Sequence, residues 1–339
     1  MKSFPCVAVF VLVATLSLPG IVLADGSGDP AAVKQEDGKY LDKDGNPTYK
    51  IQTDGTVDWY TYSGYRRYTS ECLRCHGPVV ELETEKQLFY CKDCDYQFTA
   101  TAGTVFNDSH LPLEKWFAAT FLLCESKKGM SACQIQRTLG IGSYKTAWYL
   151  CHRIRAAMKE ASTMLDGTVE IDETYVGGKP RKGMPRRDKQ VVFGIRQRGG
   201  RLHLVHAGAG DAKAKTVRQI LGDHISEDVE VIITDESQIY PYGMNERQRK
   251  SHKTICHRKE YVNGLVHTNT AESSFSQLKR GIMGTWHNVS AKHLQAYLDE
   301  MQFRFNRRKN PDLFLDTLRH MVTAPVLTFK KLTKDSEAA

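Results

Sequence analysis

The sequence lacks three features that mark common classes of exported and membrane protein. Its nine cysteines do not form a disulfide framework, because four of them fall in two CxxC pairs and the rest are scattered. Beyond an apolar stretch from Val7 to Leu23 there is no long hydrophobic run, so we expect no membrane association of the mature protein. An acidic excess is also missing, since 47 basic and 39 acidic residues give a net charge of +8.

The basic residues are bunched along the chain. Clusters lie at 145–155, 181–189, 247–259 and 304–309. Bunched cations favour a polyanionic partner such as nucleic acid, although any single cluster is explained equally well as a solvated charge run. The 339 residues are sufficient for two or three domains.

The first 71 residues have the character of an exported protein. Residues 1–24 have the form of a signal peptide, with an early Lys2, the apolar stretch and a small-residue cleavage site at Ala24. Residues 25–71 are rich in turn signals, and we expect them to be loosely structured. From Gly38 to Cys72 this stretch resembles the leader of an exported c-type cytochrome of the methanol-oxidation type. It ends in Cys72-Leu73-Arg74-Cys75-His76, a haem-attachment signature.

A second cysteine pair competes with the haem interpretation. Fifteen residues separate Cys72-x2-Cys75 from Cys91-x2-Cys94, which is the spacing of a four-cysteine zinc ribbon. A cytochrome would continue with helices and a distal Met, whereas this chain continues to the second CxxC pair. We therefore predict a zinc ribbon over 72–106 with Zn²⁺ bound by Cys72, Cys75, Cys91 and Cys94. Haem on the first pair and unliganded buried thiols are the alternatives.

Residues 107–160 are predicted to be helical. A mostly apolar helix runs from Leu111 to Cys124, a second opens at Ser131 and ends at Gly140, and a third begins at Ser143. The third helix carries one apolar face: Ala147, Leu150, Cys151, Ile154 and Met158. The last two helices form a plausible helix-turn-helix. Its second helix would present four side chains outward to a DNA major groove: Lys145, Tyr149, His152 and Arg153.

Carboxylates stand at the ends of two predicted strands. The run 168–172 carries Asp172 and is followed by Gly177-Gly178, and strand-like runs at 191–195 and 202–207 complete an antiparallel meander. A later apolar strand, 229–234, ends on Asp235. Alternation in the first strand places Glu170 and Asp172 on one face and Glu173 on the other. A half-exposed strand with a solvated acidic face is the alternative interpretation.

Two helices follow the strands. The first opens near Thr268 or Asn269 and carries Glu272 and Lys279 on nearly the same face. The second runs from Ala291 to about Arg307 with an apolar stripe that we expect to pack on the sheet. We expect 310–339 to be a C-terminal tail, disordered from Lys330 onward.

Three sequence runs carry a second resemblance. VEIDETYVGGK, TDESQIY and HTNTAESSFSQLKRGIMGTWHNVSAKHLQAYLDEMQFRFNRR are similar to transposases of the IS1595 group, also called ISXO2-like, over about Cys72 to Lys309. The resemblance implies an α/β fold over 165–309: a ribonuclease-H-like mixed sheet with flanking helices, preceded by the zinc ribbon and the helix-turn-helix. It also implies a DDE triad of Asp172, Asp235 and Glu272 that binds two Mg²⁺ (or Mn²⁺) ions, with Asp172 bridging them.

The resemblance also implies supporting residues and partners. Lys279 and Arg280 are expected to hold phosphates near the cut, and Asn269, His267 and His257 to support the metal ligands. Each has an alternative role as an ordinary helix cap or surface side chain. The expected partners are the terminal inverted repeats of the element, target DNA and further copies of this chain.

Three functions from different classes follow. The leading hypothesis is a transposase that cleaves the ends of an insertion sequence and transfers the strands. The second is an exported c-type haem protein that carries electrons through Cys72, Cys75 and His76, and the third is a DNA-binding remnant without catalysis. A transposase needs the cytoplasm and its nucleoid, whereas the signal-like segment would direct export to the periplasm. We therefore hypothesise a fusion in which the insertion sequence inserted into a cytochrome gene, so that the cytochrome leader now precedes the transposase.

Overall fold

The computed structural model describes residues 33–34, 39–41, 47–51, 57–59, 72–82, 88–177, 189–256, 264 and 266–334. The predicted signal peptide, most of the basic cluster at 181–189, His257 and the last five residues lie outside this set. The chain divides into two compact units, Met1–Ala100 and Thr101–Ala339. Among the described residues, none of the helices combines the length and apolar character that a membrane span requires.

The first unit contains two small antiparallel sheets. Four short strands lie in the segment that we expected to be loosely structured: β1 (Val33–Lys34), β2 (Lys39–Leu41), β3 (Pro47–Ile51) and β4 (Val57–Trp59). The second sheet is formed by β5 (Val79–Leu82), β6 (Leu88–Cys91) and β7 (Gln97–Thr99). Phe89 and Phe98 stack on it with ring centroids 5.6 Å apart. Because this apolar core is so small, a bound metal would add greatly to its stability.

The second unit begins with three helices: α3 (Leu113–Glu125), α4 (Ala132–Thr138) and α5 (Tyr144–Ala157). The Ser131 hydroxyl caps α4 by accepting a hydrogen bond from the backbone N–H of Gln134 at 3.2 Å. The apolar face predicted for α5 is confirmed, because all five of its residues are buried. The expected tail instead contains α11 (Leu313–Thr323) and α12 (Phe329–Thr333), and α11 packs on α3 and α5. Apolar side chains such as Met321 and Leu332 are buried there, which explains why this segment is ordered.

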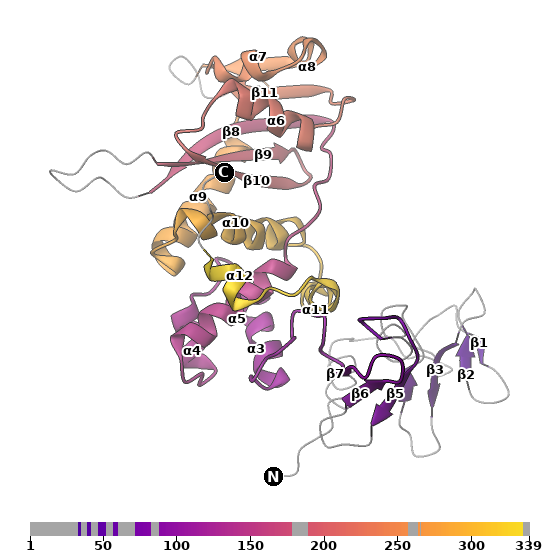
Figure 1. The fold of residues 1–339 in the computed structure, drawn as a ribbon. Helices are drawn as coiled ribbons and strands as arrows, with labels where there is room; N and C mark the ends of the chain where they lie inside the picture. The colour runs from indigo at the N-terminus through magenta and orange to yellow at the C-terminus, as the bar shows by residue number, and fades with distance from the viewer. Residues whose placement is uncertain are drawn as a thin grey trace. The chain divides into compact units, whose positions relative to one another are not determined.

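A five-stranded mixed sheet follows, in the order β10-β9-β8-β11-β12 (Figure 1). The strands are β8 (Thr168–Val176), β9 (Gln190–Gln197), β10 (Leu202–Ala209), β11 (Val231–Asp235) and β12 (His252–Ile255). The first three form the predicted antiparallel meander, whereas β11 lies parallel to both β8 and β12. Helix α6 (Ala214–His224) connects β10 to β11, and the short helices α7 (Ile239–Gly243) and α8 (Glu246–Lys250) connect β11 to β12.

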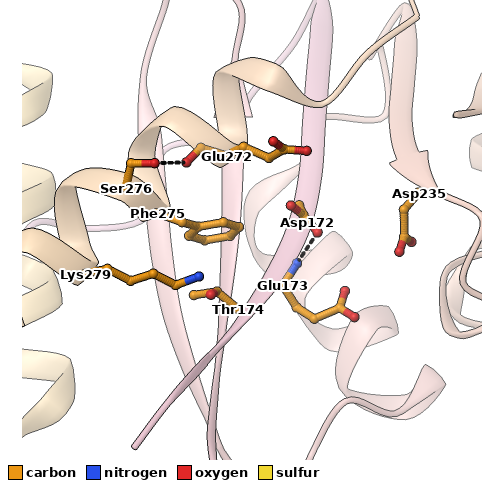
Figure 2. Close-up of a pocket in the computed structure, with 8 residues that line it drawn as sticks. All are labelled: Asp172, Glu173, Thr174, Asp235, Glu272, Phe275, Ser276 and Lys279. Atoms are coloured by element: carbon orange, nitrogen blue, oxygen red, sulfur yellow. Dashed lines mark hydrogen bonds between the residues drawn. The ribbon is translucent and has the colours of Figure 1, made fainter. Parts of the chain in front are cut away.

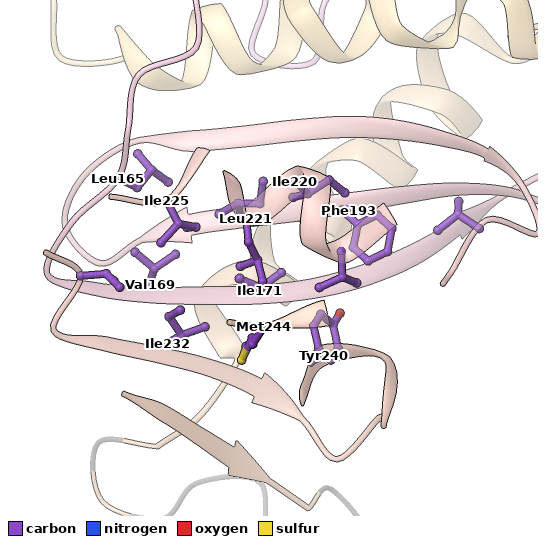
Figure 3. Packing of buried hydrophobic residues seen from close by; sticks show 14 residues of the cluster. Leu165, Val169, Ile171, Phe193, Ile220, Leu221, Ile225, Ile232, Tyr240 and Met244 are labelled. Carbon is purple, nitrogen blue, oxygen red and sulfur yellow. The ribbon is translucent and has the colours of Figure 1, made fainter. Parts of the chain in front are cut away.

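Both faces of the sheet are covered. Val191, Phe193 and Ile195 of β9 belong to the core on one face, where they pack with residues of α6 and α7. Figure 3 shows Phe193 beside Ile220 and Leu221 of α6. Val192 points to the opposite face, which is covered by three consecutive helical segments: α9 (Asn269–Gly281), the π-helical η1 (Ile282–Trp286) and α10 (Ala291–Asn306). The alternation of β9 therefore fixes α9 against the sheet. Each fully buried apolar side chain of this kind stabilises the fold by about 1.5–3 kcal/mol.

The sheet leaves one edge of β8 open. β11 pairs with β8 only at Thr168, Val169 and Glu170, although β8 continues to Val176 with β9 as its partner on the other side. The backbone and side chains of β8 beyond Glu170 therefore face a gap at the end of β11. Asp172 and Glu173 lie in this part of the strand.

Candidate active site

A pocket of 310 Å³ lies at the open edge of β8 (Figure 2). Its walls come from β8, from the end of β11 and from α9. Its lining residues are predominantly polar: Asp172, Glu173, Thr174, Asp235, Glu272, Phe275, Ser276 and Lys279. The structure thus brings the predicted Asp172, Asp235, Glu272 and Lys279 into one pocket, and their catalytic roles stay predictions.

The surroundings of Asp172 raise its pKa. Burial raises the pKa of Asp172 to about 7, and the charge of Glu173 adds to the shift, with smaller contributions from Asp235 and Glu272. The backbone N–H of Glu173 donates to its Oδ1 at 2.8 Å and opposes the shift. The pocket therefore concentrates negative charge in a partly buried place, a setting in which a bound cation would be stabilised.

Asp235 and Glu272 approach the pocket from different elements. Asp235 is the last residue of β11, and its Oδ1 accepts a hydrogen bond from the backbone N–H of Ser237 at 3.0 Å. Glu272 lies in the first turn of α9, where the Thr268 hydroxyl donates to its Oε1 at 3.3 Å. Lys279, two turns further along α9, lines the same pocket and is the cationic side chain among the lining residues.

Glu173 also lines the pocket, and our prediction that it points away was wrong. Strand alternation places it opposite Asp172, but β11 does not flank β8 at this position, so the long Glu173 side chain reaches the space beyond the strand end. The hydroxyl of the buried Tyr240 on α7 donates a hydrogen bond to Glu173 Oε2. Burial raises the pKa of Glu173, and the Tyr240 hydrogen bond opposes that shift.

A glycine on β9 lets α9 approach the sheet closely beside Asp172. Gly194 pairs with Asp172 across the β8–β9 ladder. A Cβ at Gly194 would lie 2.7 Å from the ring of Phe275, closer than atoms pack. The missing side chain therefore makes room for Phe275, which lies one turn beyond Glu272 on the same helix.

Glu170 does not reach the pocket, although it shares a strand face with Asp172. It is fully buried, and its carboxylate accepts hydrogen bonds from the backbone N–H groups of Thr270 and Ala271 at 2.9 and 3.0 Å. Arg198 donates to the same carboxylate at 2.7 Å. Glu170 thus fixes the first turn of α9 to β8, a contact that sequence reasoning missed because only the fold shows where α9 begins in space.

The other predicted supporting residues lie apart from the pocket. His267 lies beside the buried Glu170, with its Nδ1 3.3 Å from Glu170 Oε1. Asn269 is exposed at the start of α9, and the exposed Arg280 donates its Nε–H to the backbone oxygen of Ser276 at 3.0 Å. His257 lies outside the described residues.

The four paired cysteines meet in the first unit. Their Sγ atoms all lie within 4.8 Å of one another. The Sγ atoms of Cys72 and Cys94 are 3.5 Å apart, as are those of Cys75 and Cys91. A tetrahedral Zn²⁺ with Zn–S bonds of about 2.3 Å requires sulfur atoms roughly 3.8 Å apart, so this donor set fits zinc.

The outward placement predicted for α5 was wrong at two positions. His152 is 1% exposed and contacts the rings of Trp148 and His293, and Arg153 is 2% exposed. Tyr149 is half-buried and donates its hydroxyl hydrogen to the backbone oxygen of Leu327. The physical reason is that other helices cover the side of α5 that we expected to be free: α10 packs on His152, α3 on Arg153 and α12 on Tyr149.

Lys145 is the exception on that side of α5. Its side chain is exposed, and its Nζ lies 4.4 Å from the centroid of the Phe329 ring on α12. Two consecutive helices and a short turn are present, but the face intended for a DNA groove is largely buried.

Comparison with known proteins identifies the class. Residues 164–306 match the family model for the ISXO2-like transposase domain, so the chain is a transposition enzyme. It is also 33% identical over 237 residues to the "Uncharacterized protein in transposable element ISH50" of Halobacterium salinarum, a match that spans 64% of this chain and 78% of that protein. The chain belongs to the ISXO2-like transposase family and is a transposase of an insertion sequence.

Two further likenesses are weaker. A stretch of 64 residues is 48% identical to cytochrome c-553I of Paracoccus denitrificans, covering 19% of this chain and 28% of that cytochrome. A solved structure, a pre-cleavage Mos1 transpososome, is 10% identical and covers 66% of this chain and 83% of its own, with a TM-score of 0.25.

Proposed function

We propose that this transposase cleaves phosphodiester bonds at the ends of its element and joins them to target DNA, with Asp172, Asp235 and Glu272 as a DDE triad. The observation that carries the proposal is the single pocket in which three separate elements place these carboxylates. The sheet order, with three antiparallel strands followed by two parallel ones, supports a ribonuclease-H-like fold for the domain.

The pocket fits divalent cations. Its donors are carboxylate oxygens, the ligands that Mg²⁺ and Mn²⁺ prefer. The raised pKa of Asp172 is caused first by burial and then by the neighbouring Glu173 charge, and a bound cation would stabilise the ionised form against both. Asp172, Asp235 and Glu272 would hold the cations. When bound, divalent cations would supply activation of the attacking oxygen and stabilisation of the leaving oxygen.

The chain's own residues position the DNA. Lys279 would hold a phosphate oxygen beside the triad, because it is the cation among the pocket's lining residues. Glu173 extends the acidic surface toward Asp235, where Tyr240 holds it in place. We include Glu173 as a further candidate metal ligand that the triad pattern omits.

We also propose that the four cysteines bind structural zinc and that the chain acts on DNA in the cytoplasm, as an oligomer assembled on the element's terminal repeats. The Sγ geometry supports zinc. Helices α4 and α5 remain a candidate helix-turn-helix, with Lys145 as its exposed cation.

The haem alternative is favoured only by the cytochrome-like stretch and the Cys72-x2-Cys75-His76 signature. The four-cysteine cluster weighs against it, because the two haem-type cysteines lie beside Cys91 and Cys94. Metal analysis of the purified protein distinguishes the two: one zinc per chain without a haem absorbance band supports the ribbon.

The decisive experiment replaces Asp172 or Asp235 by Asn. Each variant should lose Mg²⁺-dependent cleavage of the element's ends by at least a thousandfold while binding the same DNA normally. Glu246→Asn is the matched control, because Glu246 is an exposed acid on α8 outside the pocket. Undiminished cleavage by Asp172→Asn would refute the proposal.

A further inference from the structure

A second hollow, of 430 Å³, lies in the unit Thr101–Ala339 beside the candidate active site. Its walls are the end of α3 with the turn that follows, the C-terminal part of α9 with η1, and the end of α10. We call it the basic groove and define it by six of its lining residues: Lys127, Lys128, Gln277, Gly281, Trp286 and Arg308.

The lining of the basic groove is strongly cationic. It contains five lysines and arginines against a single acid, Glu125. Two of the arginines form ion pairs within the protein. Arg304 is buried, with its Nη2 3.1 Å from Glu300 Oε1, and Arg307 pairs with Glu160. The remaining three cations are exposed: Lys127, Lys128 and Arg308. Among the described residues, none of these three forms an ion pair with a carboxylate, so their charge is available to a ligand.

Arg308 is held in a fixed orientation. Its Nη1 donates to the backbone oxygen of Phe305 at 2.8 Å, and its guanidinium lies 4.3 Å from the centroid of the Phe305 ring. A guanidinium has five N–H donors, and this arrangement leaves most of them free. A planar donor group fixed in this way suits the oxygens of a phosphate.

Trp286 contributes a buried donor to the same lining. It is 9% exposed, and within the described part of the chain its indole Nε1–H has no hydrogen-bond acceptor. Buried N–H groups in native proteins are nearly always paired, and a ligand in the hollow is one source of an acceptor for this group. A phosphate oxygen provides both the acceptor and the negative charge.

Helix α9 joins the basic groove to the candidate active site. Glu272 and Lys279 line the carboxylate pocket, whereas Gln277 and Gly281 line the basic groove. With a rise of 1.5 Å per residue, Glu272 and Gly281 are about 13 Å apart along the helix axis. A DNA duplex advances ~3.4 Å per base pair, so that distance corresponds to about four base pairs.

We propose that the basic groove binds the phosphate backbone of duplex DNA a few base pairs from the phosphodiester held at Asp172, Asp235 and Glu272. Its contacts are independent of base sequence, because lysine and arginine side chains on phosphates carry no base information. The location of the cut rests on the proposed function, but the affinity of the groove for DNA does not.

The test compares two triple variants of the full chain. Lys127→Gln/Lys128→Gln/Arg308→Gln removes the free cations of the groove. Lys215→Gln/Arg218→Gln/Arg249→Gln is the matched control, since it removes three exposed cations from α6 and α8, outside both hollows. Binding to a 30-base-pair duplex of mixed sequence is measured by fluorescence anisotropy at several salt concentrations, with neither Mg²⁺ nor Mn²⁺ added, so that no cleavage occurs and the cysteine-bound zinc is kept.

The groove variant should bind at least tenfold more weakly than the control variant. The slope of log affinity against log salt should fall by about 2–3, because each lost phosphate contact removes roughly 0.9. Equal affinities and slopes for the two variants would overturn the proposal. Circular dichroism melting confirms that both variants are folded, and the exposed single variants Lys127→Gln and Lys128→Gln provide the same comparison should the triple variant melt early.

Trp286→Phe provides an independent measurement. The ring keeps its apolar packing while the indole N–H is removed, so affinity for the same duplex should fall about fivefold, the value of one hydrogen bond of roughly 1 kcal/mol. Unchanged affinity would remove Trp286 from the site. If the groove variants lose binding but Asp172→Asn still cleaves, the groove stands and the triad assignment fails.

Discussion

The Glu170 carboxylate on β8 accepts hydrogen bonds directly from the first turn of α9. Its Oε2 accepts the backbone N–H of Thr270 at 2.9 Å, while its Oε1 accepts the Thr270 hydroxyl hydrogen. A negative charge at a helix N-terminus also stabilises the helix through the exposed N–H groups. Because Glu272 lies two residues after Thr270, the position of one triad member depends on this buried contact.

Glu170→Gln should both destabilise the protein and impair cleavage. The amide retains one acceptor oxygen but places an NH₂ group against N–H donors and leaves Arg198 without its carboxylate. We expect the free energy of unfolding to fall by about 3 kcal/mol, measured by urea denaturation. Glu246→Gln, which removes an exposed carboxylate paired with Lys250, should change it little. Full stability and full cleavage in the Glu170 variant would contradict the anchoring role.

Gly194→Ala tests the close approach of α9 to the sheet. The new methyl group would meet the Phe275 ring and push α9 outward, at a cost of about 1–3 kcal/mol in unfolding free energy. We expect cleavage to fall more than tenfold through displacement of Glu272. Gly222→Ala on α6 is the matched control, since a Cβ there meets nothing within 4 Å. That control should be slightly more stable than the wild type, because alanine favours a helix interior over glycine.

Zinc removal should affect the first unit selectively. Cys91→Ser should abolish binding of one zinc per chain, measured by atomic absorption, and should unfold the small sheet β5-β6-β7, which has little apolar core. Cys133→Ser should keep its zinc, because Cys133 is an exposed cysteine outside the cluster. Retention of zinc by the Cys91 variant would exclude the four-cysteine site.

His152 should make the second unit sensitive to acid. Burial among aromatic rings, together with the nearby Arg155 and His293 charges, lowers the pKa of His152 to about 2. Below the ordinary histidine pKa near 6.5 the unfolded chain takes up a proton that the folded chain excludes. The free energy of unfolding therefore decreases as the pH is lowered, by about 1.4 kcal/mol per pH unit, or roughly 2 kcal/mol from pH 6.5 to pH 5.

The variant His152→Phe should lose that part of the acid sensitivity. Its unfolding free energy, measured by denaturant titration at pH 7 and pH 5, should change less between the two values than that of the wild type. His110→Phe, at an exposed histidine, is the control and should retain the wild-type difference. An unchanged pH dependence in the His152 variant would show that this buried imidazole does not control acid unfolding.

Several elements could be predicted because their signals are local. The apolar face of α5, the meander β8-β9-β10 and the strand that ends on Asp235 follow from periodicity and turn residues. Spacing alone also indicated the cysteine cluster. The failures arose where distant segments pack together: His293 and Tyr297 of α10 pack on His152, Trp116 of α3 lies against Arg153, and no local pattern indicates those contacts.

The carboxylates, the cysteines and the elements that carry them can be identified from residue type and spacing along the chain. The places of these side chains in the folded protein depend on tertiary packing. Because β11 pairs with only the first residues of β8, Glu173 lines the pocket. Glu170 is buried instead and binds the first turn of α9. Helix α9 also lines the basic groove, which therefore lies beside the pocket. These outcomes depend on strand register and on packing between residues far apart in sequence, which side-chain alternation cannot specify.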